Sequence, residues 1–207
     1  MEIRGLSALV TGASGFIGSW LAERLATEEG VRVRAMVRDT RKAERLRKLP
    51  LEIVQGDLCD LESLRRAADG CNLVFHCAAL VRETGNRNAF LQTNVQGTEN
   101  ILKASRDAGV KKFIHFSSVA VYGMNPPDRA DETTPFHLCG NLYCDTKIAA
   151  EKAVWATHQE TRLPVVVIRP AIVYGPYSNP WTVLPIKLIN SGQMILINDG
   201  MGLCNYV

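Results

Sequence analysis

Two side chains with proton-transfer chemistry lie four residues apart in the C-terminal half of the chain. Tyr143 and Lys147 fall on a predicted helix, so both side chains emerge on one face. A phenol exchanges protons readily near neutral pH only if its pKa falls well below about 10, and a neighbouring ammonium lowers that pKa. We therefore expect Lys147 to lower the pKa of Tyr143. Ser118, at the end of a predicted strand, could hold a substrate carbonyl or hydroxyl.

A tyrosine–lysine pair recurs by chance on many helices. It therefore indicates a catalytic site only if the surrounding elements position it in one. Residues 6–11 form an apolar run, followed by GASGFIG (residues 12–18) and then by a helical pattern. This order predicts a dinucleotide site, in which Gly12 takes the tight turn, Gly15 lets a diphosphate approach and Gly18 lets helix and strand pack closely. The first amides of the helix then point at the phosphates. The alternative is a plain turn rich in small residues.

Strands and helices alternate along the chain, which predicts an α/β fold with a mostly parallel sheet and helices on both faces. The expected strands are residues 6–11, 31–38, 51–56, 73–78, 112–118, 164–169 and 194–197. The first expected helix begins at residue 19. The others cover residues 41–48 (capped by Asp39 or Thr40), 60–68, 90–108, 143–158 and 180–191. Residues 124–140 are expected to form a loop.

Composition narrows the class of protein. The 207 residues are 46% hydrophobic and 22% charged, which suits one globular domain over residues 1–207. A net charge of +3 gives no general affinity for nucleic acid, and we expect no membrane segment and no signal peptide. The six cysteines are scattered without a Cys-x-x-Cys pair, which indicates reduced thiols in a cytoplasmic protein without a metal site.

The end of the predicted second strand bears on the choice between NAD and NADP. NAD enzymes of this architecture usually place an acid there to hold the ribose 2′-hydroxyl, whereas this chain has Val37 followed by Arg38. A guanidinium suits a 2′-phosphate through charge-assisted hydrogen bonds, so we favour NADP over NAD. The alternative is that the basic residues as far as Lys48 form only a solvated helix face.

Other polar and small residues follow the predicted strands. Asp57 is placed to accept a hydrogen bond from an adenine amino group, or is a simple loop residue. Ala78 and Ala79 are small and leave room for a diphosphate and ribose. We expect His76 to be a core histidine without chemistry. Asn94 either orders the helix behind the site or serves as a structural cap.

The order of the motifs resembles that of the extended short-chain dehydrogenase/reductases, the NAD-dependent epimerase/dehydratase family, over essentially the whole chain. The motifs are TGASGFIG (residues 11–18), GDL (56–58), HCAA (76–79), NVQGT (94–98), SSVAVYG (117–123), Tyr-x-x-x-Lys (143–147) and RPAIVYGP (169–176).

This resemblance implies a Rossmann-like doubly wound sheet of order 3-2-1-4-5-6-7 and a catalytic set of Ser118, Tyr143 and Lys147. It also implies that Ser117 lines the cofactor side. The candidate cofactor-binding residues are Gly12, Ser14, Gly15, Phe16, Ile17, Gly18, Arg38, Asp57, Leu58, Ala78, Ala79, Asn94, Ser117, Tyr143 and Lys147, with Pro170, Ile172 and Val173 near the nicotinamide.

Two departures from the family pattern bear on the substrate. The missing acid and the short loop over residues 80–89 resemble the NADP-using dihydroflavonol-reductase and hydroxysteroid-dehydrogenase-like branches. Family members also continue past the position of Val207 into a C-terminal substrate-binding region. We therefore expect either the cofactor-binding portion of a longer enzyme or a naturally shortened one.

The expected reaction is reversible hydride transfer between a nicotinamide and a secondary alcohol or ketone. The substrate is either a sugar nucleotide or a hydroxysteroid-like or flavanonol-like ketone. The alternative is a non-catalytic NADP-binding scaffold or redox sensor. Family members often dimerise through the helix after Asn94 and the Tyr143 helix, so a homodimer is a further expectation.

Overall fold

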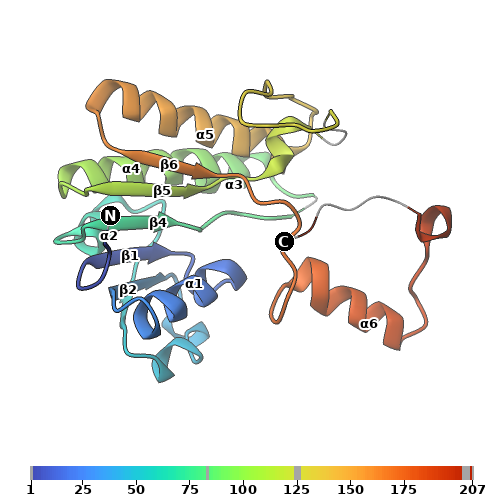
Figure 1. Cartoon of the computed structure of the whole chain (residues 1–207), viewed down its shortest axis with the longest axis horizontal. Helices are drawn as coiled ribbons and strands as arrows, with labels where there is room; N and C mark the ends of the chain where they lie inside the picture. The colour runs from blue at the N-terminus through green and yellow to red at the C-terminus, as the bar shows by residue number, and fades with distance from the viewer. Residues whose placement is uncertain (1, 83, 124–126, 202–205, 207) are drawn as a thin grey trace. The chain divides into compact units, whose positions relative to one another are not determined.

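Six parallel strands form the sheet that carries the candidate site (Figure 1). The computed structural model describes residues 2–82, 84–123, 127–201 and 206, apart from the side chains of residues 197 and 198. The chain divides into two units, Met1–Arg169 and Pro170–Val207, and the sheet belongs to the first.

The strands of the first unit are β1 (Ser7–Thr11), β2 (Arg32–Val37), β3 (Glu52–Gln55), β4 (Leu73–His76), β5 (Lys112–Phe116) and β6 (Val165–Ile168). Its α-helices are α1 (Phe16–Thr27), α2 (Leu61–Ala68), α3 (Arg87–Phe90), α4 (Gly97–Asp107) and α5 (Leu142–Thr161). Shorter segments are the 3₁₀ turns η1 (Thr40–Lys42), η2 (Leu46–Lys48) and η4 (Val119–Tyr122), and the π-helical η3 (Leu91–Gln96).

The strand order is β3-β2-β1-β4-β5-β6, and every pairing is parallel. Residue Ala8 of β1 pairs with Val33 of β2 on one side and with Leu73 of β4 on the other. The strand order therefore reverses at β1 and β4, and in such sheets ligands bind beyond the carboxyl ends of the strands at this switch point. The expected order of the first six strands is confirmed.

Two hydrophobic cores lie on opposite faces of the sheet because alternate side chains of each strand point to opposite faces. Leu9 of β1 joins the core that packs against α2, α4 and α5. Its neighbours Ala8 and Val10 join the core that contains α1 and η2. This arrangement confirms the expected helices on both faces.

Two predicted helices take other forms. The segment expected to be one helix over residues 41–48 forms η1 and η2 instead. Tertiary contacts outweigh its helical pattern, because Ala43 and Leu46 are buried and Arg45 pairs with Glu23 of α1. Asp39 does cap this segment, since its Oδ1 accepts from the Arg41 amide at 3.1 Å. The long helix expected over residues 90–108 is interrupted by η3, a wider turn that leaves Asn94 buried.

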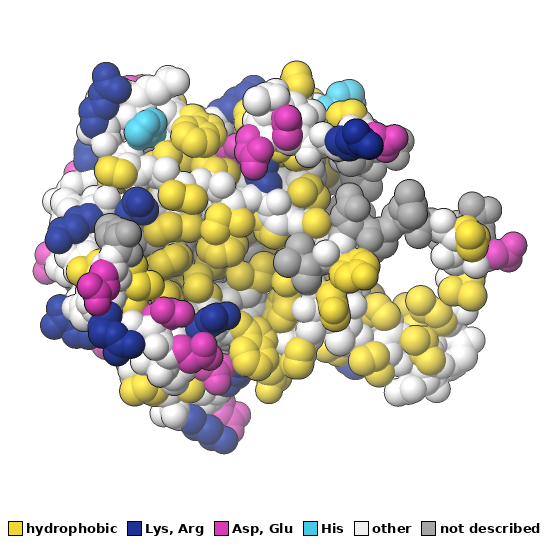
Figure 2. All heavy atoms as spheres, viewed as in Figure 1, with side chains coloured by type: hydrophobic (Ala, Val, Ile, Leu, Met, Phe, Trp, Pro, Cys, Tyr) yellow, Lys and Arg dark blue, Asp and Glu magenta, His cyan; other side chains and the backbone are white. Residues whose placement is uncertain are grey.

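The second unit contains the π-helical η5 (Asn179–Val183), α6 (Leu184–Asn190) and the 3₁₀ turn η6 (Ile197–Gly200). Within it, Ile172 and Tyr206 form an isolated parallel bridge. Many of its large hydrophobic side chains are exposed, and Figure 2 shows them over α6.

The predicted seventh strand over residues 194–197 is wrong. Residues 194–196 have no strand partner within the described part of the chain, and residue 197 begins η6. Ile195 is 81% exposed and Leu196 is 70% exposed. A strand needs a neighbouring strand for its backbone hydrogen bonds, and the apolar character of the segment cannot supply one.

Candidate functional site

The glycine turn after β1 is shaped by close backbone contacts. Gly12 has a φ of +68°, and a Cβ atom there would lie 2.8 Å from the Cα and N atoms of Ala78. A Cβ at Gly18 would overlap the carbonyl oxygen of Gly12. The turn can therefore be made only by residues without side chains at these two positions, as the sequence predicted.

The helix that follows begins without a side-chain cap. Gly15 is the N-cap of α1 and has no side-chain oxygen to bind the first amides of the helix. Ser14 and Gly15 are exposed, and Phe16, Ile17 and Gly18 form the first turn. Because the first amides of an α-helix have no partner inside the helix, they fit the oxygens of a dinucleotide diphosphate.

The end of β4 is tied to the glycine turn by a buried hydrogen-bond chain. The Nδ1 atom of His76 lies 2.8 Å from Oγ1 of Thr11, and its Nε2 lies 3.0 Å from Oγ1 of Thr98. The amide of Ala78 donates to Oγ1 of Thr11 at 3.2 Å. Burial lowers the pKa of His76 to about 3, so this ring is neutral. His76 is a satisfied core histidine, as expected.

Tyr143 lies in the first turn of α5, where its position is set by the cap. The Oδ1 atom of Asn141 accepts from the amides of Tyr143 at 2.9 Å and Cys144 at 3.1 Å. The Ser118 hydroxyl, which follows β5 and caps η4 through the Ala120 amide at 3.2 Å, lies close enough to the Tyr143 phenol to influence its pKa. Two of the three candidate catalytic side chains are therefore neighbours.

The third, Lys147, points into the interior one turn further along α5. Its Nζ atom donates to the carbonyl oxygen of Phe116, the last residue of β5, at 2.5 Å. The side chain is buried, and this burial lowers the pKa of Lys147 to about 8. At neutral pH it is therefore still an ammonium.

The effect expected of Lys147 on Tyr143 is absent from this arrangement. Burial raises the pKa of the Tyr143 phenol above its usual value, and the neighbouring Ser118 hydroxyl opposes that rise. The Lys147 ammonium is bonded to the Phe116 carbonyl and not to the phenol. The predicted lowering of this pKa is therefore wrong, and the phenol is protonated at neutral pH.

Asn94 joins the loop after β4 to α5. Its side-chain amide donates to the Leu80 carbonyl at 3.1 Å and to Oγ1 of Thr146 at 3.1 Å, and its Oδ1 accepts from the Leu80 amide at 2.7 Å. These bonds use the buried side chain fully. Asn94 thus orders the elements behind Tyr143 and Lys147, which is one of the two roles expected of it.

The two candidate residues at the adenine end lie on loops. Arg38 is exposed directly after β2, and within the described residues its guanidinium makes no hydrogen bond or ion pair. By contrast, Arg41 is bound by both carboxylate oxygens of Asp39. The Oδ1 atom of Asp57 accepts from the Cys59 amide at 2.8 Å, a loop-ordering role, and Leu58 is buried.

One polar residue behind the site was not predicted from the sequence. Glu151 is completely buried on α5, and its Oε2 accepts from Oγ of Ser117 at 2.6 Å. It also pairs with Arg169. The signal that could have found it is the spacing, because Tyr143, Lys147 and Glu151 follow one another at intervals of four on the same helix face.

The remaining candidates lie elsewhere in the chain. Ala79 is half-buried in the loop after β4. Pro170, Ile172 and Val173 belong to the second unit, so their expected place near a nicotinamide stays a prediction. Within the described residues, no cluster of acidic, histidine or cysteine side chains could hold a metal ion, and no helix could cross a membrane.

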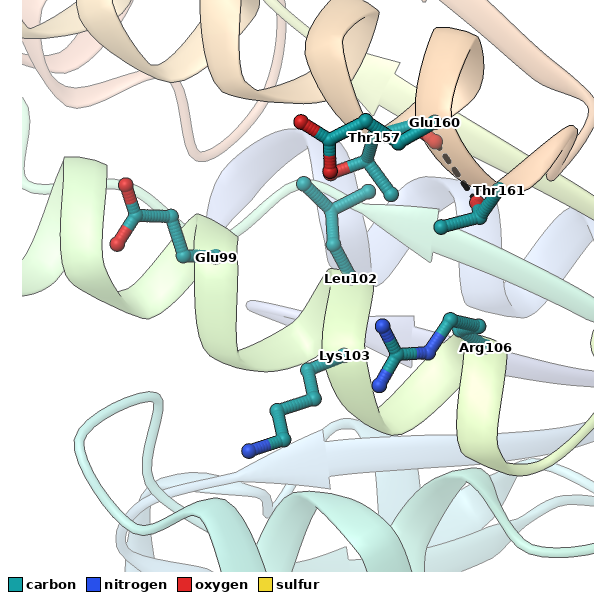
Figure 3. A pocket seen from close by; sticks show the side chains of 7 residues that line it. All are labelled: Glu99, Leu102, Lys103, Arg106, Thr157, Glu160 and Thr161. Carbon is teal, nitrogen blue, oxygen red and sulfur yellow. Dashed lines mark hydrogen bonds between the residues drawn. The ribbon is translucent and has the colours of Figure 1, made fainter.

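A pocket of about 330 Å³ lies away from these residues, between α4 and α5 (Figure 3). Lys103 and Arg106 of α4 and Glu160 of α5 line it, together with Glu99 and Leu102. It shares no residue with the candidate site. The expected homodimer would use these two helices and stays a prediction.

The buried side chain of His115 is expected to make the stability of the fold depend on pH. Its two ring nitrogens have no hydrogen-bond partner within the described residues, and burial lowers the pKa of His115 well below its usual value. The unfolded chain therefore binds more protons below about pH 6.5, and stability is lost as the pH falls. We expect His115→Leu to reduce this loss by about 1.4 kcal/mol per pH unit and to leave stability at pH 7.5 unchanged or higher.

Urea unfolding from pH 7.5 to pH 4 measures this difference. The same substitution at the exposed His137 is the matched control. If His115→Leu and the original chain lost stability equally with acid, His115 would not be held neutral in the fold.

A strand, a glycine turn and a helix at the switch point of a parallel sheet define a Rossmann-type dinucleotide-binding protein. The sequence profile of the NAD dependent epimerase/dehydratase family matches residues 8–206. The chain belongs to this family, as its motifs predicted.

Similar sequences include plant reductases. The chain is 36% identical over 192 residues to cinnamoyl-CoA reductase 1 of Petunia hybrida, covering 84% of this chain and 56% of that protein. It is 34% identical over 214 residues to the bifunctional dihydroflavonol 4-reductase/flavanone 4-reductase of Pyrus communis, covering 93% and 61% respectively. The chain thus spans less than two thirds of the length of these relatives.

Similar solved structures include enzymes of sugar nucleotides. One is DesIV, a dTDP-glucose 4,6-dehydratase from Streptomyces venezuelae with NAD and TYD bound (TM-score 0.87, 27% identity, 98% of this chain and 68% of that one). Another is the UDP-glucuronic acid 4-epimerase of Bacillus cereus in complex with NAD (TM-score 0.79, 26% identity, 91% and 64%). These likenesses agree with the doubly wound α/β fold.

Proposed function

We propose that this chain binds NADPH at the carboxyl edge of the sheet and takes part in reducing a ketone or related carbonyl to an alcohol. The observation that carries the proposal is the neighbouring Ser118 and Tyr143 side chains, with the buried Lys147 ammonium one turn further along α5, in the same unit as the glycine turn. Membership of a family that includes named reductases, dehydratases and epimerases supports it.

When bound, a reduced nicotinamide supplies the hydride that adds to the carbonyl carbon. Tyr143 is the proton donor, because burial keeps its phenol protonated and a growing alkoxide needs a proton. Ser118 holds the same oxygen through its hydroxyl. The phenolate left behind then recovers a proton from solvent. The Lys147 ammonium, which is bonded to the Phe116 carbonyl, would hold the ribose of the cofactor. For a ketone such as a dihydroflavonol, the net change is one hydride and one proton added across the carbonyl, which gives an alcohol. For a thioester such as cinnamoyl-CoA, the carbon–sulfur bond of the hydride adduct then breaks, so that CoA leaves as its thiol and an aldehyde remains.

Two observations favour a reductase over a sugar-nucleotide enzyme. The relatives that are 36% and 34% identical are named reductases, whereas the sugar-nucleotide enzymes of known structure are 27% and 26% identical. Arg38 also directly follows Val37, which stands where an NAD enzyme would carry an acid.

The two reactions differ in cofactor balance. A reductase consumes one NADPH for each product, whereas an epimerase returns its cofactor and shows no net consumption. Incubating the purified chain with NADPH and either cinnamoyl-CoA or a dihydroflavonol, and separately with a dTDP- or UDP-sugar, separates them. NADPH binding without turnover of either class would favour the non-catalytic scaffold instead.

The preference for NADPH depends on Arg38. We expect Arg38→Gln to weaken NADPH binding about 10–100-fold, the size of one lost charge-assisted hydrogen bond, and to leave NADH binding nearly unchanged. Arg41→Gln is the matched control, because that guanidinium is already bound by Asp39. Fluorescence titration of both cofactors measures the effect. Equal binding of NADH and NADPH by the original chain would contradict this role.

A further inference from the structure

The carboxylate of Glu151 has an unusually complete set of donors for a buried group. Its side chain is 0% exposed. Oε2 accepts from Oγ of Ser117 at 2.6 Å, and Oε1 accepts from Nε1 of Trp155 at 3.2 Å. The Nε atom of Arg169 lies 3.1 Å from each carboxylate oxygen, and its second guanidinium nitrogen donates to Oε1 at 2.5 Å. These bonds stabilise the ionised form, and the pKa of Glu151 is lowered accordingly.

Arg169 is itself fixed on its far side. Its Nη1 atom donates to the phenol oxygen of Tyr122 at 2.6 Å, and that phenol donates to the Asp131 carbonyl at 2.7 Å. The guanidinium also lies over the Tyr122 ring, 5.1 Å from its centroid. The Glu151–Arg169 pair is therefore held rigidly rather than shared with solvent.

The pair is attached to the candidate site through two successive residues of the chain. Ser117, which donates to Glu151, directly precedes Ser118. Phe116, which precedes Ser117, accepts from Nζ of Lys147. The segment that carries Ser118 is thus bonded to α5 at two inward-facing positions one turn apart.

Glu151 also differs from the other groups that face Lys147. His76 and Cys77 face it from β4 and the residue after it, and His115 faces it from β5. Both histidines are neutral because burial lowers their pKa values, and the Cys77 thiol is neutral because burial raises its pKa to about 12. Within the described residues, Glu151 is therefore the anion that acts on Lys147 at neutral pH.

We propose that Glu151 is a positioning residue, whose charge keeps the Lys147 side chain an ammonium and whose bond to Ser117 fixes the segment carrying Ser118. The kinetic part of this inference rests on the proposed function, whereas the effect on Lys147 does not. Arg169 pairs with Glu151 and so keeps the buried carboxylate ionised.

The direct test is the titration of Lys147 itself. In the full chain labelled with [ε-¹³C]lysine, the Lys147 resonance is the one missing from a Lys147→Arg variant. We expect its midpoint near pH 8 in the original chain and about one pH unit lower in Glu151→Gln, because a nearby opposite charge is lost. Glu160→Gln, the same change at an exposed position of α5, leaves the midpoint unchanged. An unchanged midpoint in Glu151→Gln overturns the inference.

A second variant guards against loss of folding. Glu151→Gln leaves Arg169 buried without its partner, so Glu151→Gln/Arg169→Met removes both charges together. The Lys147 midpoint should fall in this variant as well. Ser117→Ala keeps the carboxylate and removes only its bond to the segment after β5, so the Lys147 midpoint should stay near pH 8.

The rate readout separates this inference from the proposed function. The pH profile of kcat/KM is measured with NADPH and either cinnamoyl-CoA or a dihydroflavonol. Its fall at high pH, the alkaline limb, should move to lower pH in Glu151→Gln by the same amount as the Lys147 midpoint. If the midpoint moves and the limb does not, the charge inference stands and Lys147 is not the group that controls the rate. If neither moves, Glu151 is only structural.

Discussion

Replacing Tyr143 by phenylalanine is expected to slow carbonyl reduction about 10²–10⁴-fold while leaving NADPH binding within about twofold. The phenol is the proton donor of the proposed reaction, and phenylalanine keeps the ring but removes the proton. Burial keeps the phenol protonated at neutral pH, so the loss should be full across the neutral range. Single-turnover oxidation of bound NADPH, with cinnamoyl-CoA or a dihydroflavonol as acceptor, measures it.

The controls for this variant are an exposed tyrosine and the cofactor itself. Tyr206→Phe removes a phenol that is 70% exposed in the second unit and should leave the rate unchanged. Fluorescence titration with NADPH shows whether Tyr143→Phe retains the binding site. A Tyr143→Phe chain that reduces the acceptor at the original rate would exclude Tyr143 as the proton donor.

Replacing Gly12 by alanine is expected to destabilise the first unit by about 2–5 kcal/mol and to abolish NADPH binding. A residue with a side chain is strained at a φ of +68°, at about 1–2 kcal/mol. The new methyl group would also lie 2.8 Å from backbone atoms of Ala78, and overpacking of this kind costs about 1–3 kcal/mol more. Urea unfolding and NADPH titration measure the two effects.

Gly70 supplies the matched control. It has nearly the same φ, +69°, but a Cβ atom there would meet nothing within 4 Å. Gly70→Ala should therefore cost only the conformational part, about 1–2 kcal/mol, and should leave NADPH binding intact. An equal loss of unfolding free energy in the two variants would mean that the close approach of Gly12 to Ala78 does not affect stability.

The local pattern of the sequence was enough to predict most of the sheet. Apolar runs bounded by turns predicted the first six strands, and the family resemblance implied their order in the sheet. The glycine spacing predicted the turn at Gly12 and Gly18, because only residues without side chains fit there. The order of the motifs was enough for the family.

Where local pattern is ambiguous, the prediction failed. The apolar run at residues 194–196 could not be distinguished from a strand, and the basic run at residues 41–48 could not be distinguished from a helix. A strand needs an edge to pair with, and the burial of Ala43 and Leu46 outweighs the helical pattern of the basic run. The C-terminal half of the predicted site, from Pro170 to Val173, remains a prediction for the second unit.

Residue types and spacing predicted that Tyr143 and Lys147 lie on one face of a helix and that Ser118 lies at the end of a strand. Only the tertiary structure decided how they are charged. Folding places Lys147 against the Phe116 carbonyl, surrounds Tyr143 so that its pKa rises, and buries Glu151 behind both. The reason is that pKa values depend on burial and on neighbours distant in sequence, which no local pattern records.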